Sequence, residues 1–326
     1  MFPEVRLRRL RQTPGIRRML ETPLPRPEKL IWPTFVIPGT NQRQPIDSMP
    51  GQARLSIDQL LHDLDPLVQT GLGGILLFGL AEPHEKDPHG HAAHDPNGTV
   101  QQAITAIKKE FPHLTVVADV CVCAYTDHGH CGTLNPAGQV DNDATLNNLA
   151  RVALSHAQAG ADIVAPSSMM DGQVRALRTA LDQQHFDQTL IMAYSTKFAS
   201  SLYGPFRDAE KSAPGSGDRK AYQAAPGDPR TALRESELDE AEGADILMLK
   251  PSLFYLDILT QLRANTNLPL AAYNVSGEYS MLHATAERGW GDLHAMARES
   301  LLSLTRAGAD ILITYWANQY AQLQKD

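Results

Sequence analysis

Short apolar runs rich in β-branched residues recur along the whole chain and alternate with longer amphipathic stretches. Eight such runs can be recognised, and their nearly continuous hydrophobicity is typical of strands that are buried on both faces, as in a parallel sheet. We therefore predict strands at Ile31–Ile37, Gly74–Gly79, Leu114–Val120, Asp162–Ala165, Leu190–Tyr194, Asp245–Leu249, Leu270–Tyr273 and Asp310–Thr314.

The stretches between these runs have the spacing of amphipathic helices. The predicted helices are Ile57–Gln69, Val100–Glu110, Ala144–Ala159, Gly172–Asp182, Pro229–Ala241 and Leu293–Arg306. A short Gly-Ala-Asp-Ile repeat, at 160–163, 243–246 and 308–311, follows three of them and leads directly into a strand. Its glycine is suited to the left-handed cap of a helix, so each copy predicts one helix-to-strand turn of the same kind.

Eight strands connected by helices predict a single α/β domain, a (β/α)8 (TIM) barrel. The alternative is an open doubly wound sheet, but the Gly-x-Gly-x-x-Gly signature of dinucleotide binding is missing after the first strand. We assign residues 29–326 to the barrel and residues 1–28 to an extended N-terminal arm that packs on another subunit. The segment 198–228 is long and rich in Gly, Pro and Ser, so we expect it to form a lid over the catalytic face.

Composition excludes several classes of function. The formal net charge is −8, with 29 basic and 37 acidic residues, which argues against nucleic-acid binding because that requires a basic surface. No apolar stretch is long enough to cross a membrane. The first 18 residues hold six arginines, which would also suit a transit peptide, although serine is absent from this segment. Three clustered cysteines do not form a disulfide framework and favour a reducing, cytoplasmic location.

Lys197 and Lys250 stand at the predicted ends of neighbouring strands. A buried lysine has a lowered pKa, and its neutral amine can attack a ketone to form a Schiff base. Two ammonium groups at adjacent strand ends lower at least one of the pKa values further. For either lysine the alternative is an ion pair with a carboxylate, or an apolar stem buried with the charged end in water, and it becomes less favoured when both lysines are considered together.

Cys121, Cys123 and Cys131 form a tight cluster after the third strand. Thiolates suit Zn²⁺, and three protein ligands leave a fourth position for water or substrate, as in a catalytic site. Three buried, unreactive cysteines are the alternative. The lid carries Arg207 and Arg219, whose planar guanidinium groups would bind a carboxylate, although ordinary surface charges would give the same pattern.

These residues lie in motifs that closely resemble one family, porphobilinogen synthase (5-aminolevulinate dehydratase). The resemblance covers nearly the whole chain. The motifs include the segments 119–132, 165–167, 169–172, 194–201, 203–207, 217–220, 248–251 and 273–279.

The resemblance implies that two molecules of 5-aminolevulinate are condensed to porphobilinogen with loss of two waters, in tetrapyrrole (heme) biosynthesis. It implies Schiff bases on Lys250 and Lys197, a polar environment from Asp119 and Ser167, and catalytic Zn²⁺ on the three cysteines. One substrate carboxylate would be bound by Arg207, Arg219 and Gln223, and the other by Ser276 and Tyr315.

The family also implies a Mg²⁺ site that includes Glu235, and an octamer whose arms wrap neighbouring subunits. Two other interpretations stay open at this point. A barrel of the aldolase type would use one Schiff-base lysine, and a non-catalytic descendant would act as a binding protein. Neither accounts for two lysines together with three cysteines and the lid arginines.

Overall fold

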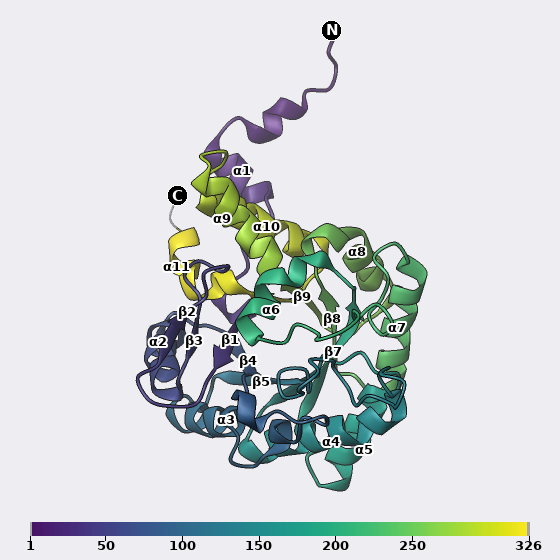
Figure 1. Cartoon of the computed structure of the whole chain (residues 1–326). Coiled ribbons are helices and arrows are strands. Elements are labelled where there is room, and N and C mark those ends of the chain that lie inside the picture. The colour runs from purple at the N-terminus through teal and green to yellow at the C-terminus, as the bar shows by residue number, and fades with distance from the viewer. Residues whose placement is uncertain (1, 325–326) are drawn as a thin grey trace.

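The computed structural model describes residues 2–324 and shows a closed barrel of eight parallel strands surrounded by helices (Figure 1). The strand order is β1-β4-β5-β6-β7-β8-β9-β10, and pairing of β10 with β1, Leu312 beside Leu30, closes the ring. The predicted (β/α)8 barrel is thereby confirmed.

All eight predicted strands are present, with ends that differ by a few residues. The barrel strands are β1 (Leu30–Val36), β4 (Gly74–Gly79), β5 (Thr115–Val120), β6 (Ile163–Pro166), β7 (Leu190–Lys197), β8 (Ile246–Lys250), β9 (Leu270–Asn274) and β10 (Ile311–Thr314). The largest difference is at β7, which continues past the predicted end at Tyr194, so that Lys197 lies inside the strand.

The six predicted helices are also present. They are α2 (Ile57–Gln69), α3 (Thr99–Glu110), α4 (Asn142–Ala159), α5 (Gln173–Gln183), α7 (Pro229–Glu242) and α10 (Leu293–Ala307). The structure adds helices that were not predicted: α1 (Pro14–Leu20), α6 (Gly204–Glu210), α8 (Leu256–Asn265), α9 (Ser276–Glu287) and α11 (Tyr320–Leu323).

The Gly-Ala-Asp-Ile repeat is a repeated tertiary contact as well as a helix cap. Gly160, Gly243 and Gly308 cap their helices at φ of 103°, 105° and 115°. The aspartate two residues later accepts a hydrogen bond from a backbone N–H of the preceding strand: Asp162 from Val116 at 2.8 Å, and Asp245 from Ile191 at 2.8 Å. Asp310 does the same with Leu270 at 3.0 Å. Each copy therefore fixes the start of one strand against its neighbour.

A small hairpin, which was not predicted, follows the first barrel strand. It consists of β2 (Arg43–Pro45) and β3 (Ala53–Leu55), which pair antiparallel, and β3 adds to the end of β1. From β3, Arg54 donates hydrogen bonds to the carbonyls of Asp208 and Ala209 at 2.8 and 2.6 Å. The hairpin thus holds the C-terminal end of α6 in the lid.

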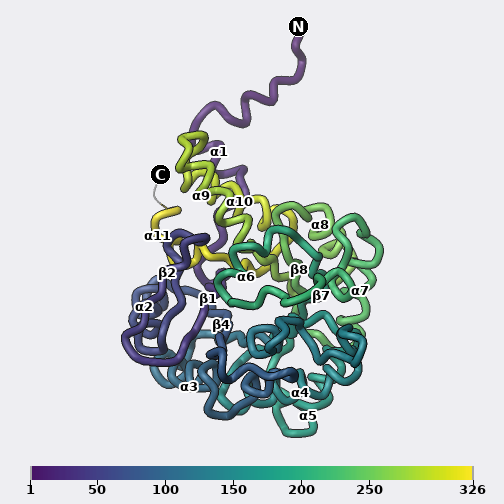
Figure 2. Tube along the Cα trace, in the orientation of Figure 1, coloured from purple at the N-terminus to yellow at the C-terminus, as the bar shows by residue number. Residues whose placement is uncertain are grey.

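The N-terminal segment leads away from the barrel, as Figures 1 and 2 show. It contains a 3₁₀ helix at Leu7–Arg11 followed by α1, so it is partly helical and not fully extended. None of the described helices is both long and apolar enough to cross a membrane.

Candidate active site

The two lysines are neighbours in the barrel. Lys197 and Lys250 are direct register partners in the pairing of β7 with β8, and their side chains are 5% and 3% exposed. Within residues 2–324, neither ammonium group forms an ion pair. The ion-pair alternative for these lysines therefore finds no support in the structure.

Aromatic rings surround the Nζ atom of Lys250. Nζ lies 4.1 Å from the ring centre of Tyr273, 4.7 Å from that of Phe206 and 5.1 Å from that of Tyr194. Burial, and next the charge of Lys197, lower the pKa of Lys250 from 10.5 to about 7. An appreciable fraction of this amine is therefore neutral at neutral pH.

Lys197 and Asp119 add polar groups to the barrel mouth, beside Lys250. The Nζ of Lys197 donates a hydrogen bond of 2.5 Å to the backbone carbonyl of Ser167, a buried residue at the end of β6. Asp119 lies on β5, and its Oδ1 is buried without a hydrogen-bond partner. Burial, followed by Cys121 and Glu210, raises the pKa of Asp119 to about 8, so this carboxyl can act as a proton donor near neutral pH.

The three cysteines converge directly after β5. Their Sγ atoms all lie within 4.8 Å of one another, all three side chains are buried, and Cys121 and Cys123 are 3.3 Å apart. Sulfurs bound tetrahedrally at about 2.3 Å from zinc would be about 3.8 Å apart. Hydrogen bonds from the other two thiols, together with Arg219, lower the pKa of Cys131, which favours its thiolate. The thiol set therefore fits zinc.

The loop that carries Cys131 is tied to the lid. His130 Nδ1 lies 3.2 Å from the hydroxyl of Tyr222, and His130 Nε2 lies 3.0 Å from the carbonyl of Ser216. The Nη2 atom of Arg219 donates to the carbonyls of Gly129 and Ser212 at 3.0 and 2.6 Å. The position of the cysteine centre thus depends on the lid segment.

The predicted carboxylate-binding residues of the lid have unused hydrogen-bonding atoms. Arg219 and Gln223 are buried, and the Nε atoms of Arg207 and Arg219 lack a partner in the structure. Both polar atoms of the Gln223 amide are buried without a partner as well. Unpaired buried donors of this kind are costly unless a ligand satisfies them, so these three side chains are suited to an anion.

Ser276 and Tyr315 lie at the ends of the last two barrel strands. The backbone N–H of Phe206 donates to Ser276 Oγ at 3.0 Å, which joins this position to the lid helix α6. The hydroxyls of Tyr315 and Tyr273 are 3.2 Å apart, and both tyrosines are fully buried. The structure therefore brings both residues close to the aromatic surroundings of Lys250.

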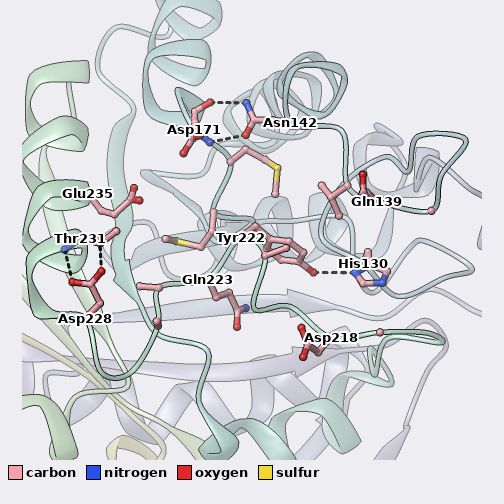
Figure 3. Close-up of a pocket in the computed structure, with 18 of the residues that line it drawn as sticks. His130, Gln139, Asn142, Asp171, Asp218, Tyr222, Gln223, Asp228, Thr231 and Glu235 are labelled. Carbon is pink, nitrogen blue, oxygen red and sulfur yellow. Dashed lines mark hydrogen bonds between the residues drawn. The ribbon is translucent and has the colours of Figure 1, made fainter.

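Glu235 lies apart from the lysines, on α7. It lines a cavity of about 630 Å³ that His130, Asp171, Tyr222 and Gln223 also line, as Figure 3 shows. Burial, and next the carboxylate of Asp171, raise the pKa of Glu235. Glu235 and Asp171 thus place two carboxylates along the wall of one cavity.

Two buried carboxylates of the site were not predicted. Glu278 accepts hydrogen bonds from the backbone N–H groups of Leu253 and Val275 at 2.7 and 2.9 Å, and thereby ties together the segments that follow β8 and β9. Glu210, the last residue of α6, lies beside Cys123. Glu210 is far from the cysteines in sequence, so no local sequence pattern indicates this contact.

Comparison with known proteins identifies the family. The family model described as delta-aminolevulinic acid dehydratase matches residues 4–323. This chain belongs to that family. A delta-aminolevulinic acid dehydratase from Halalkalibacterium halodurans is 50% identical over 97% of this chain and 96% of the relative. One from Methanothermobacter thermautotrophicus is 50% identical over 97% and 96% of the two chains.

This chain has the fold of a delta-aminolevulinic acid dehydratase over nearly its whole length. The crystal structure of the enzyme from Toxoplasma gondii, in complex with the reaction product porphobilinogen, matches with a TM-score of 0.95 at 42% identity. The match covers 98% of this chain and 91% of the other. The chain is therefore an enzyme of the lyase class.

Proposed function

We propose that the protein condenses two molecules of 5-aminolevulinate to porphobilinogen, the reaction of its family, as a step of tetrapyrrole biosynthesis. The observation that carries the proposal is the pair of buried lysines, adjacent in register, beside a centre of three buried thiols. The membership of the chain in the dehydratase family supports the same reaction.

The lysines would hold the substrates covalently. The neutral amine of Lys250 attacks the ketone carbon of one 5-aminolevulinate, the oxygen leaves as water, and a carbon–nitrogen double bond forms. Lys197 would do the same with the second molecule. The lowered pKa of Lys250 supplies the neutral amine. The aromatic rings around Nζ stabilise the charged form of this amine more than a purely aliphatic pocket would.

Asp119 and Ser167 would serve proton transfer and positioning at these centres. A carboxyl group with a pKa of about 8 is mainly protonated at neutral pH, so Asp119 can donate a proton to a departing hydroxyl and then accept one back. The carbonyl of Ser167 holds the amine of Lys197 in place through its hydrogen bond.

Cys121, Cys123 and Cys131 would hold zinc. When bound there, zinc supplies a Lewis acid that polarises a substrate oxygen or amine. Asp119 lies two residues before Cys121, and its register partner on β6, Ala165, lies two residues before Ser167, whose carbonyl binds Lys197. This arrangement supports one site that contains both the thiols and the lysines.

The substrate carboxylates would be bound at two places. Arg207, Arg219 and Gln223 offer unpaired donors under the lid, and Ser276 with Tyr315 offers hydroxyl groups near β9 and β10. Bidentate contacts from arginine orient a carboxylate as well as binding it.

The remaining assignments concern assembly and regulation. We propose a Mg²⁺ site at Glu235, a homo-octamer in which residues 1–28 contact a neighbouring subunit, and a cytoplasmic location. The paired carboxylates of Glu235 and Asp171 support the first. Exposed apolar side chains of the arm support the second, with Phe2 95%, Leu7 67% and Met19 84% exposed.

The reaction is tested by incubating the purified protein with 5-aminolevulinate and Zn²⁺ and measuring porphobilinogen. We expect product from the wild type and from Lys109→Met, a control at an exposed lysine of α3. Lys250→Met and Lys197→Met should each lower kcat by about 10³-fold or more, since a covalent step is lost. Retained condensation in Lys197→Met would favour the single-lysine aldolase scheme, and absence of product from the wild type would contradict the proposal.

The metal assignment has its own test. Chelation should remove activity, and Zn²⁺ with a thiol reductant should restore it. Bound zinc, measured by elemental analysis, should fall in the triple variant in which all three cysteines are serine. Full activity in a chelated sample without bound zinc would remove the metal from the mechanism.

A further inference from the structure

A bulge in β7 turns the side chain of Tyr194 into the barrel. Two residues separate Ala193 from Thr196 on β7, whereas one residue separates their pairing partners on β8. Residues three apart in a regular strand point to opposite faces, and one extra residue brings them to the same face. The bulge therefore allows Tyr194 and Lys197 to share the interior of the barrel.

The neighbouring side chains agree with these directions. Thr196 Oγ1 lies 2.5 Å from Ser236 Oγ on α7, so Thr196 points out of the barrel toward the helices. Tyr194 is fully buried, and its ring centre lies 5.3 Å from the Nζ of Lys197 and 5.1 Å from the Nζ of Lys250. One ring thus lies close to both amines of the proposed reaction.

Three tyrosine rings lie near the Nζ of Lys250, and their hydroxyl groups differ in their partners. The hydroxyl of Tyr273 is 3.2 Å from that of Tyr315. The hydroxyl of Tyr203 donates to two backbone carbonyls, at 2.8 and 3.1 Å. The hydroxyl of Tyr194 is buried and has no hydrogen-bond partner within residues 2–324. Of the three tyrosines, Tyr194 is therefore the one whose hydroxyl is available to a substrate.

A buried hydroxyl without a partner has lost its hydrogen bonds to water and gained none in return. A ligand that accepts a hydrogen bond would remove this cost. Burial, and next the charge of Asp119, raise the pKa of Tyr194 above its usual value, so the phenol keeps its proton. A protonated phenol near an attacking amine is suited to an oxygen on which negative charge develops.

We propose that Tyr194 is a further catalytic residue, whose hydroxyl donates a hydrogen bond to the ketone oxygen of the substrate that Lys250 attacks. The inference rests on the proposed condensation of 5-aminolevulinate and deepens it. Lys250 is chosen over Lys197 because the Nζ of Lys197 already donates to the carbonyl of Ser167.

The hydrogen bond acts while the Schiff base forms. The lone pair of the amine forms the carbon–nitrogen bond, the π electrons of the carbonyl move onto oxygen, and a proton from the amine turns this oxygen into a hydroxyl. Asp119 gives the hydroxyl a second proton, water leaves, and the nitrogen lone pair forms the double bond of a protonated Schiff base. Tyr194 keeps its own proton and stabilises the charge on oxygen in the first step.

Rapid borohydride trapping measures how fast 5-aminolevulinate forms the adduct on Lys250. The proteins compared are the wild type, Tyr194→Phe and a matched control, Tyr255→Phe, at a half-buried tyrosine of the segment after β8. We expect trapping to be about 100-fold slower in Tyr194→Phe and unchanged in Tyr255→Phe. The analogue 5-aminopentanoate has the same amine and carboxylate but no ketone, so all three proteins should bind it equally.

Trapping at the wild-type rate in Tyr194→Phe would overturn the proposal. A matching loss of affinity for 5-aminopentanoate would also overturn it, because the substitution would then have disturbed the pocket and not a contact to the ketone. A wild type that gave no adduct on Lys250 would end the proposed condensation together with this role of Tyr194. The two failures are therefore distinguishable.

Denaturant unfolding without substrate separates a catalytic role of the hydroxyl from a structural one. The Tyr194 hydroxyl has no partner, so Tyr194→Phe should leave the midpoint of unfolding unchanged or raise it. Tyr203→Phe removes two hydrogen bonds and should lower the midpoint. A midpoint lowered as much in Tyr194→Phe as in Tyr203→Phe would assign the hydroxyl a structural role and contradict the proposal.

Discussion

At the scale of single residues, the chemistry depends on removing Lys250 from water. The side chain is 3% exposed, faces aromatic rings and stands beside a second lysine. Burial and the charge of Lys197 disfavour the ammonium form, and the rings supply no counter-charge to it. The result is an amine that can act as a nucleophile at a pH at which an exposed lysine is almost completely protonated.

This environment predicts the pH dependence of kcat/KM. The pKa of Lys250 is lowered from 10.5 to about 7, and only the deprotonated amine reacts. We expect kcat/KM to rise about tenfold per pH unit below about pH 7 and to fall again above about pH 8, where Asp119 loses the proton that it donates. Steady-state kinetics from about pH 5 to 9 checks this, and a profile that is flat below pH 7 would contradict the assigned nucleophile.

The residues of the site differed in how well the sequence could predict them. Lys197, Lys250 and the cysteines follow apolar strands directly, so strand ends and local motifs place them at the barrel mouth. Glu210 reaches Cys123 across 87 positions of the chain. Such a contact depends on how the lid folds back over the barrel, which local periodicity does not contain.

At the scale of elements, the Gly-Ala-Asp-Ile repeat explains how successive βα units keep their register. The glycine ends the helix in a left-handed conformation, and the aspartate accepts a hydrogen bond from a backbone N–H at the start of the preceding strand. In two copies a basic side chain also pairs with the aspartate, Lys108 with Asp162 and Arg263 with Asp310.

Asp245 has no such basic partner among the described residues, so its copy gives the cleanest test. Asp245→Ala leaves the N–H of Ile191 without its 2.8 Å partner, so we expect the free energy of unfolding to fall by about 1–3 kcal/mol. Denaturant unfolding measures this change. Asp187→Ala, at an exposed position of the turn before β7, serves as the control, and an equal effect of both substitutions would contradict the role of the repeat.

The elements were predicted well where burial dictates the pattern and poorly elsewhere. The strands are buried on both faces and stand out as apolar runs. The β2–β3 hairpin was missed because all three residues of β2 are exposed and both strands are only three residues long. Helix α9 was missed because it begins with the buried polar residues Ser276 and Glu278, which obscure an amphipathic pattern.

At the scale of the whole molecule, the barrel and its arm have different surfaces. Six apolar side chains of the arm are more than half exposed: Phe2, Val5, Leu7, Leu10, Met19 and Leu20. None of residues 2–28 belongs to the buried hydrophobic core of the barrel. A surface of this kind is typical of a segment that contacts another protein chain.

Removal of residues 2–22 tests that assignment. We expect the truncated chain to form assemblies smaller than the octamer proposed for the full chain, because the apolar contacts of the arm would be lost. Sedimentation velocity measures the difference, and circular dichroism shows whether the barrel is still folded. Unchanged sedimentation after correction for mass would mean that the arm does not hold subunits together.

The central claim is covalent catalysis by two adjacent lysines, and borohydride trapping tests it most directly. The zinc-loaded protein is reduced in the presence of 5-aminolevulinate, digested and mapped by mass spectrometry. We predict a reduced substrate adduct on Lys250 and a second adduct on Lys197. A folded, zinc-loaded sample with no adduct on either lysine would contradict the account.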